Sequence, residues 1–149
     1  MPDFVFNTAL GKVRYYAELP ATNDALVLIA LESSGLESDS VLRDKDTFAD
    51  VVSGTTNEQT PVGRKTLASV TVTVDDTLDR VAIDAADISW VSPSGAAVGA
   101  LVVCYDPDTT TGTDGDLIPL TKHGFSWNPG DGVTLNLAIS DLYRTSSTG

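Results

Sequence analysis

The chain has 149 residues, of which 42% are hydrophobic, a size and composition typical of one globular domain that needs neither disulfide nor metal support. Nine Lys and Arg residues stand against 21 Asp and Glu residues, so the formal net charge is −12 at pH 7. Nucleic acids and anionic lipid surfaces are bound through clustered cations, which this sequence lacks, and we therefore expect neither as a partner.

The acidic residues are mostly aspartates, 17 of the 21, and Asp favours turns and loops. The simplest interpretation is solvated loops, with a high-salt environment or a basic partner surface as alternatives. The N-terminus, MPDFVFNTALGK, has no basic stretch followed by an apolar one, and the longest apolar run, residues 25–31, is too short to span a bilayer. These features predict a soluble protein made inside a cell.

The first half of the chain predicts two helices and a buried strand. Residues 4–6 are extended, and residues 10–19 carry apolar side chains at helical spacing up to Pro20, which ends the helix. The continuous apolar run ALVLIALES, residues 25–33, predicts a strand buried on both faces. Residues 40–54 have loosely helical spacing and end at Gly54.

The second half predicts strands throughout. Residues 66–76 alternate apolar and polar side chains, residues 80–92 continue the pattern, and residues 97–105 form a second apolar strand that contains the only cysteine, Cys104, read as a core residue. Shorter strands follow at 117–121 and 125–127, with a longer one at 133–143 and a polar tail. This predicts a mainly β fold, an antiparallel β-sandwich or barrel of six to seven strands with one or two short helices near the N-terminus.

The stretch DPDTTTGTDGD, residues 106–116, has the composition of a calcium loop. An EF-hand starting at Asp106 needs Gly at position 6 and Glu at position 12, where this chain has Thr111 and Leu117. Two interpretations remain: a flexible hairpin tip pointing at solvent or a neighbouring subunit, and a weaker calcium site. Its four aspartates would be the ligands of that site: Asp106, Asp108, Asp114 and Asp116.

We find no residues that predict catalysis, cofactor binding or a firm metal site. His123 is the only histidine, it lies in the loop-like TKHGF, and no G-x-S-x-G pattern accompanies it. One His and one Cys cannot make a zinc site. Trp127, before the turn NPGDG, is the better candidate for an exposed aromatic contact, with a sugar or with a protein.

Several stretches together carry a family resemblance. They are VFN…GKVRYY, LRDKDTFADV, DDTLDRVAIDAADISW, CYDPDTTTGTDGDLIPLT and the closing LYRTSS. The chain resembles, from about Val5 to Ser146, a widespread family of small tailed-bacteriophage virion proteins found among head and tail structural genes. The resemblance implies a non-enzymatic structural subunit without a cofactor, made in the host cytoplasm and located in the virion. It leaves open whether the protein decorates the capsid, lies at the neck or belongs to the tail.

That expectation implies other virion proteins as partners, and a homo-oligomeric or multi-copy arrangement. We expect one domain over residues 1–149, with residues 1–20 as a docking segment. Four of the ten aromatic residues lie there, and aromatic side chains anchor interfaces. The alternative is that they cover one end of this domain's own core. The candidate interface residues are Phe4, Phe6, Tyr15, Tyr16 and Trp127. A carbohydrate-binding adhesin is a further alternative.

Overall fold

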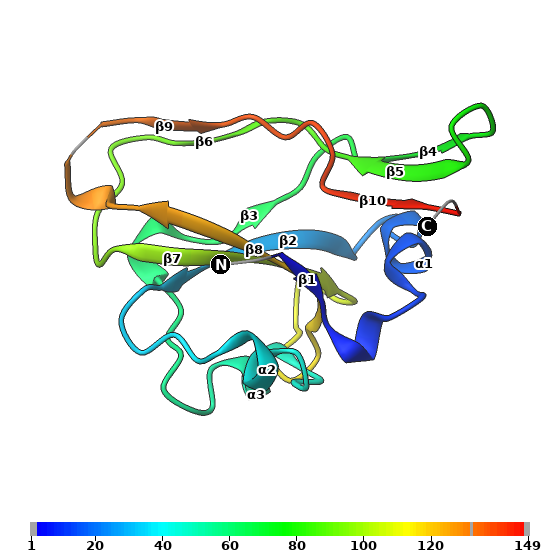
Figure 1. Cartoon of the computed structure of the whole chain (residues 1–149). Coiled ribbons are helices and arrows are strands. Elements are labelled where there is room, and N and C mark those ends of the chain that lie inside the picture. Colours follow the sequence, from blue (N-terminus) through cyan, green and yellow to red (C-terminus); the bar gives the residue numbers. More distant parts are fainter. Residues whose placement is uncertain (1–2, 132, 148–149) are drawn as a thin grey trace.

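The computed structural model describes residues 3–131 and 133–147. A five-stranded antiparallel sheet forms the middle layer, a ribbon of shorter strands covers one face, and short helices with their loops cover the other (Figure 1). The strand order of the sheet is β1 (Phe4–Val5), β8 (Ile118–Trp127), β7 (Val98–Asp106), β2 (Ala25–Glu32) and β3 (Lys65–Thr66).

The central strands are apolar along their whole length because both faces of the sheet are covered. In β2 every residue except Glu32 is buried, and in β7 every residue except Gly99 and Asp106 is buried. An antiparallel strand with one solvated face would alternate instead. The prediction of a doubly buried strand at residues 25–33 is therefore confirmed.

The covering ribbon contains two smaller antiparallel sheets. One has the order β10 (Tyr143–Ser146), β5 (Arg80–Asp84), β4 (Thr71–Asp75), and the other pairs β6 (Ile88–Trp90) with β9 (Leu135–Leu137). The first hydrophobic core cluster includes residues from both layers, among them Leu28, Leu101 and Trp90.

The opposite face carries the helical turns α2 (Asp39–Leu42) and α3 (Phe48–Val51), while α1 (Val13–Glu18) packs near β4. Three 3-10 turns complete the chain: η1 (Asn7–Ala9), η2 (Thr60–Val62) and η3 (Pro129–Asp131). The second core cluster includes Phe6, Ile29, Phe48 and Cys104, all fully buried. Burial raises the pKa of the Cys104 thiol well above its usual range, as expected for a core residue rather than a reactive one.

The predicted mainly β class with short N-terminal helices is confirmed, and the sheets are sandwich-like. They do not close into a barrel within the described residues, and ten strands replace the six to seven expected. The single helix predicted at 40–54 was wrong. Thr47 starts a new turn there, because its side chain accepts a hydrogen bond from the Asp50 amide while Asp50 accepts one from the Thr47 amide.

Two strand predictions near the C-terminus also need correction. Residues 118–121 and 125–127 belong to one strand, β8, because the polar residues between them keep pairing with β7. The strand predicted at 133–143 is interrupted: Leu135–Leu137 pairs with β6, and Tyr143 already belongs to the next strand, β10. The polar tail contributes the rest of β10, which pairs with β5.

Candidate functional site

The loop between β7 and β8, residues 107–117, is where the sequence suggested chemistry. Two of its aspartates, Asp108 and Asp116, accept hydrogen bonds from the loop's own threonines. Asp108 Oδ1 accepts from the Thr110 amide at 2.9 Å and the Thr110 hydroxyl at 2.6 Å, and also from the Thr111 amide at 3.2 Å. The Thr111 hydroxyl donates to the other oxygen, Asp108 Oδ2. The hydrogen bonds from the Thr110 and Thr111 hydroxyls contribute most to holding the pKa of Asp108 well below its usual range.

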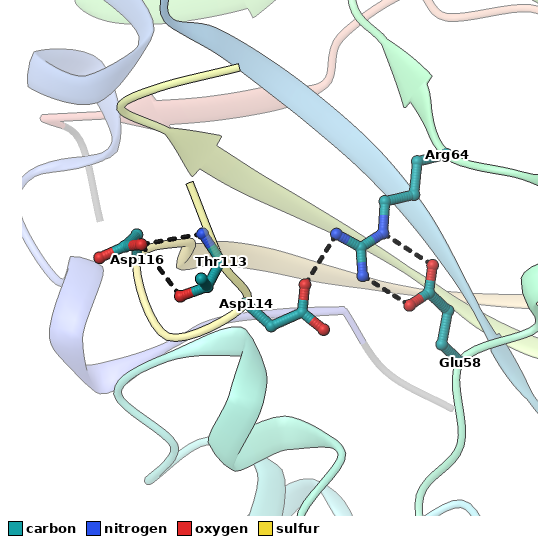
Figure 2. Close-up of polar contacts among 5 residues, drawn as sticks. All are labelled: Glu58, Arg64, Thr113, Asp114 and Asp116. Carbon is teal, nitrogen blue, oxygen red and sulfur yellow. Dashed lines mark hydrogen bonds and ion pairs between the residues drawn. The ribbon is translucent and has the colours of Figure 1, made fainter. Parts of the chain in front are cut away.

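Asp116 closes the second half of the loop in the same way. The amide and hydroxyl of Thr113 both donate to Asp116 Oδ2, at 2.9 and 3.0 Å (Figure 2). The hydrogen bond from the Thr113 backbone amide is the largest cause of the lowered pKa of the Asp116 carboxyl. Both carboxylates therefore act as turn acceptors, a role in which Asp competes with the backbone's own hydrogen bonds.

Asp114 is held by an arginine from outside the loop. Arg64 Nη1 lies 2.9 Å from Asp114 Oδ1, while Arg64 Nε and Nη2 donate to the two oxygens of Glu58 at 2.8 and 2.6 Å (Figure 2). The same guanidinium lies 5.1 Å from the ring centroid of Phe48. The hydrogen bonds that Arg64 donates to Glu58, more than any other contact, raise the pKa of Arg64 above its usual range.

Backbone hydrogen bonds attach the loop to the rest of the molecule at three points. The Thr109 amide donates to Asn23 O at 2.8 Å, the Ala49 amide to Asp114 O at 3.0 Å, and the Phe48 amide to Leu117 O at 3.0 Å. The loop is therefore attached to the rest of the domain, against α3 and the turn before β2, and its flexibility stays a prediction. Its exposed threonines remain accessible from solvent.

The four aspartates do not converge as metal ligands. Within residues 3–131 and 133–147, no group of three or more His, Cys, Asp or Glu side chains has the arrangement of a metal site. A cation would have to displace the threonine and arginine donors from Asp108, Asp114 and Asp116. Weak calcium binding stays a prediction that a chelator experiment can test.

The aromatic residues of the N-terminal segment mostly face the protein's own core. Phe6 is fully buried in the second core cluster, and Phe4 packs edge-on against it at 5.1 Å between ring centroids. Tyr16 is partly buried, 5.3 Å from the ring of Tyr105. Tyr15 is 58% exposed, so of these four side chains it alone offers a largely free aromatic surface.

Trp127, expected to be exposed, is partly buried at the end of β8. Its ring centroid lies 5.4 Å from that of Trp90 and 6.4 Å from that of Phe125. Trp90 is 2% exposed, as expected for a core residue. An aromatic side chain that packs against two other rings has less area to offer a sugar ring than an exposed one.

Sequence reasoning missed a buried charge on β8. Lys122 is fully buried, and its Nζ lies 2.7 Å from Asp39 Oδ1 and 5.4 Å from the ring centroid of Phe4. A lysine inside a strand next to an apolar run was the available signal. The contact joins β8 to the first residue of α2.

His123 also lies on β8 rather than in a loop. Its Nε2 is 3.0 Å from Thr121 Oγ1 and its Nδ1 is 3.3 Å from Asp3 Oδ2, while the Gly124 amide donates to Asp3 Oδ1 at 2.9 Å. Partial burial opposes ionisation of Asp3, but the hydrogen bond from Gly124 and the nearby His123 outweigh it and lower the pKa of Asp3.

This acid–imidazole–hydroxyl chain has the order of groups seen in hydrolases. Thr121 is only 3% exposed, however, so its hydroxyl cannot approach a substrate carbonyl unless its neighbours move. In this conformation, the three hydrogen-bonded groups hold the N-terminal residues on the edge of β8. The spacing T-x-H on a strand, which places both side chains on one face, was the signal that could have found it.

Comparison with protein-family models, with curated proteins and with solved structures finds no match to this chain. The resemblance carried by the sequence motifs therefore remains a prediction. In the described part of the chain, no helix is long and apolar enough to cross a membrane.

Proposed function

We propose that this chain is a non-enzymatic structural subunit of a tailed bacteriophage particle, associated with the capsid as a decoration or head accessory protein. The sequence resemblance motivates the class of protein. The structural observation that supports it is that large hydrophobic side chains remain exposed on a domain whose parts are joined by internal ion pairs. The most exposed of them, between 43% and 76%, are Leu10, Tyr15, Val41, Val74, Leu78, Val91 and Val133.

These side chains occur at separate places on the molecule. Leu10 and Tyr15 lie near the N-terminus, Val74 and Leu78 on the β4–β5 hairpin, and Val133 before β9. Exposed apolar surface favours contacts with other proteins. Several small contact areas fit a subunit that touches more than one neighbour, including further copies of itself.

Two charged side chains, by contrast, join separate parts of the domain to one another. Arg64 joins Glu58 to Asp114, and Lys122 joins β8 to Asp39. Such contacts stiffen a shape and require no substrate. A neck or tail protein of the same particle would use the same properties, and it is the alternative within this class.

Quantitative mass spectrometry of purified particles tests the assignment. A structural subunit of the particle is present in a copy number set by symmetry, and that of a capsid-associated subunit scales with the copy number of the major capsid protein. A copy number fixed at six or twelve per particle favours the neck or tail alternative. Absence of the chain from purified particles contradicts the proposal.

A surface variant tests the docking role of the N-terminal segment. Deleting the segment would also remove the buried Phe6, so the substitution Tyr15→Ser is the cleaner change. We expect fewer copies of this variant per particle with an unchanged melting temperature. Tyr105→Ser, at a residue buried in the first core cluster, is the matched control and should lower the melting temperature instead.

The adhesin alternative makes a separate prediction. An adhesin binds cells or glycans as an isolated protein and loses that binding in Trp127→Ala. Because Trp127 packs on Trp90 and Phe125, this substitution must be compared with the wild type at a temperature where both are folded.

A further inference from the structure

In the part of the chain that the structure describes, residues 123–127 in the outer half of β8 have no strand partner on the side of β1. The strand β1 pairs only with Thr121 and Lys122, and no other described strand pairs on that side of residues 123–127. The Asp3 carboxylate accepts the hydrogen bond of the Gly124 amide, at the place where the carbonyl of a neighbouring strand would otherwise accept it. Open edges present unpaired backbone groups to other chains.

A second wall faces this edge. Residues 138–142, between β9 and β10, are irregular. Two of their backbone amides donate away from β8: the Ile139 amide to Asp87 Oδ1 and the Leu142 amide to Ile83 O. The two walls, His123 and Phe125 on β8 and residues 137–144 opposite, enclose a recess that we call the seam groove. It lies where the two layers of the sandwich stay apart.

The seam groove is apolar inside and polar at its mouth. Its inner part is a hollow of about 200 Å³, and its mouth is a second hollow of about 300 Å³ that shares His123, Asp141 and Leu142 with the first. The apolar lining consists of Leu28, Leu101, Phe125, Leu137, Ile139 and Leu142. The mouth is lined by Asp3, His123, Asp141, Tyr143 and Arg144.

An extended segment fits this arrangement. Added to β8, it would form backbone hydrogen bonds with the open edge and point every second side chain into the apolar hollow. The β7–β8 pairing skips one residue on β7, Gly99, against two on β8, so a bulge at residues 125–126 limits the regular ladder. The docked stretch is therefore short, about five residues, or roughly 17 Å.

Charge selects the kind of segment. Asp3 and Asp141 stand at the mouth with side chains 62% and 38% exposed, and Arg144 there is already 3.3 Å from Asp141. The whole chain carries a formal charge of −12, so a second copy approaches against repulsion while a basic segment is attracted.

We propose that the seam groove binds an extended segment of a different protein, with apolar side chains at every second position and Lys or Arg at its ends. The proposal does not depend on the assignment to a phage particle. It assigns to β8 a binding role in addition to its place in the sheet.

Selection from a random nonapeptide library on the immobilised full chain tests the proposal, with counter-selection on Ala138→Trp, which fills the inner hollow. We expect enriched peptides with apolar residues at every second position, Lys or Arg at the ends and few acidic residues. Their binding should weaken at least tenfold in Ala138→Trp. Asp141→Asn should weaken it severalfold at low salt. Ala86→Trp, at an exposed position outside the groove, is the matched control and should bind like the wild type.

Ser140→Trp, on the same wall, is a second blocking variant in case Ala138→Trp fails to fold. In bound wild type, those β8 amides that face away from β7, such as that of Gly124, should gain protection from hydrogen exchange. Enrichment of peptides that bind both blocking variants as well as the wild type overturns the proposal, and so does a failure to enrich any peptide. Self-association of the chain that Ala138→Trp or Ser140→Trp abolishes would replace the foreign segment by a second copy, and overturns it as well.

Discussion

Lys122 and Asp39 form an ion pair in which the lysine is fully buried and the aspartate side chain is 18% exposed, with 2.7 Å between Nζ and Oδ1. Removing one partner of a buried pair is costly because the other charge is left without compensation, by about 3–5 kcal/mol where both are buried. We expect Asp39→Ala, which removes the carboxylate paired with the buried Lys122 ammonium, to lower the free energy of unfolding by about 3 kcal/mol. Lys122→Met should cost less, because Asp39 keeps some contact with water.

Urea denaturation measures both changes, and the double variant should lose less than the sum of the two single losses. Glu18→Ala is the control, because its pair with Arg14 is about half exposed and surface pairs contribute little. Equal losses for Asp39→Ala and Glu18→Ala would contradict the importance of burial.

Arg64 is predicted to hold the loop of residues 107–117 in place. Arg64→Lys keeps the charge but cannot donate to Glu58 in two parallel bonds and to Asp114 at once. We expect a loss of about 1 kcal/mol in unfolding free energy, modest because the arginine side chain is 34% exposed.

The more specific measurement is hydrogen exchange of the Ala49 amide, which donates to Asp114 O and should exchange faster in Arg64→Lys. The Val27–Cys104 strand pairing in the middle of the sheet should keep its protection. If the Ala49 amide exchanges as in the wild type, then the backbone bonds alone hold the loop.

Gln59 and Gly95 make a third prediction. The Gln59 side chain is 1% exposed and fully bonded: Nε2 donates to Ser94 O at 3.1 Å and Ala96 O at 2.8 Å, and Oε1 accepts from the Val62 amide. Gly95 has a φ of +106°, and a Cβ there would lie within 3 Å of Gln59 Nε2 and of the Pro61 ring. We expect Gly95→Ala to lower the unfolding free energy by about 2–3 kcal/mol.

Thermal unfolding followed by circular dichroism checks this. Gly115→Ala is the control, since nothing lies closer than 3.6 Å to a Cβ at that position. A comparable drop in melting temperature for both variants would mean that the loss of glycine, rather than the contact with Gln59, decides the effect.

The sequence predicts the parts of this fold that depend on local patterns. The apolar run at residues 25–31 and the period-two alternation at residues 70–74 identify buried and half-buried strands without knowledge of their partners. The strand β8 escapes the same reasoning, because Lys122 and His123 interrupt its pattern. The buried ammonium of Lys122 pairs with Asp39, which lies 83 residues away in sequence.

The candidate site shows the same limit. Local hydrogen bonds such as Thr113 to Asp116 follow from the turn preferences of Asp and Thr, and the failed EF-hand match was visible in the sequence. The contact of Asp114 with Arg64 spans 50 residues, and no local pattern announces it. Long-range side-chain contacts therefore decide whether this loop is free or held.

Tyr105 is predicted to give the protein a decline in stability at alkaline pH. Its hydroxyl donates to Asp24 Oδ2 at 2.8 Å, and burial, together with the negative Asp24 carboxylate, raises the pKa of Tyr105 to about 12. In the unfolded chain, a tyrosine has a pKa of about 10. Because the folded pKa is the higher one, the contribution is fully present below about pH 10 and is lost as pH rises towards 12.

Tyr105→Phe should therefore flatten the fall in unfolding free energy between about pH 10 and 12, while costing about 1 kcal/mol at pH 7 for the lost hydrogen bond. At acid pH, the unfolding free energy depends on the Asp24 carboxylate in the opposite direction. The pKa of Asp24 is lowered, first by the Ala21 amide and then by Tyr105, so its contribution is present above about pH 4 and is lost as pH falls. The variant should show a shallower acid decline as well.

Urea titrations at a series of pH values measure both limbs, and Tyr15→Phe is the matched control for loss of a hydroxyl, since its ring is largely exposed. If Tyr105→Phe kept the full alkaline decline of the wild type, another group would have to supply it. A flattened curve in Tyr105→Phe with an unchanged curve in Tyr15→Phe assigns the alkaline limb to the contact between Tyr105 and Asp24, which joins the end of β7 to the turn before β2.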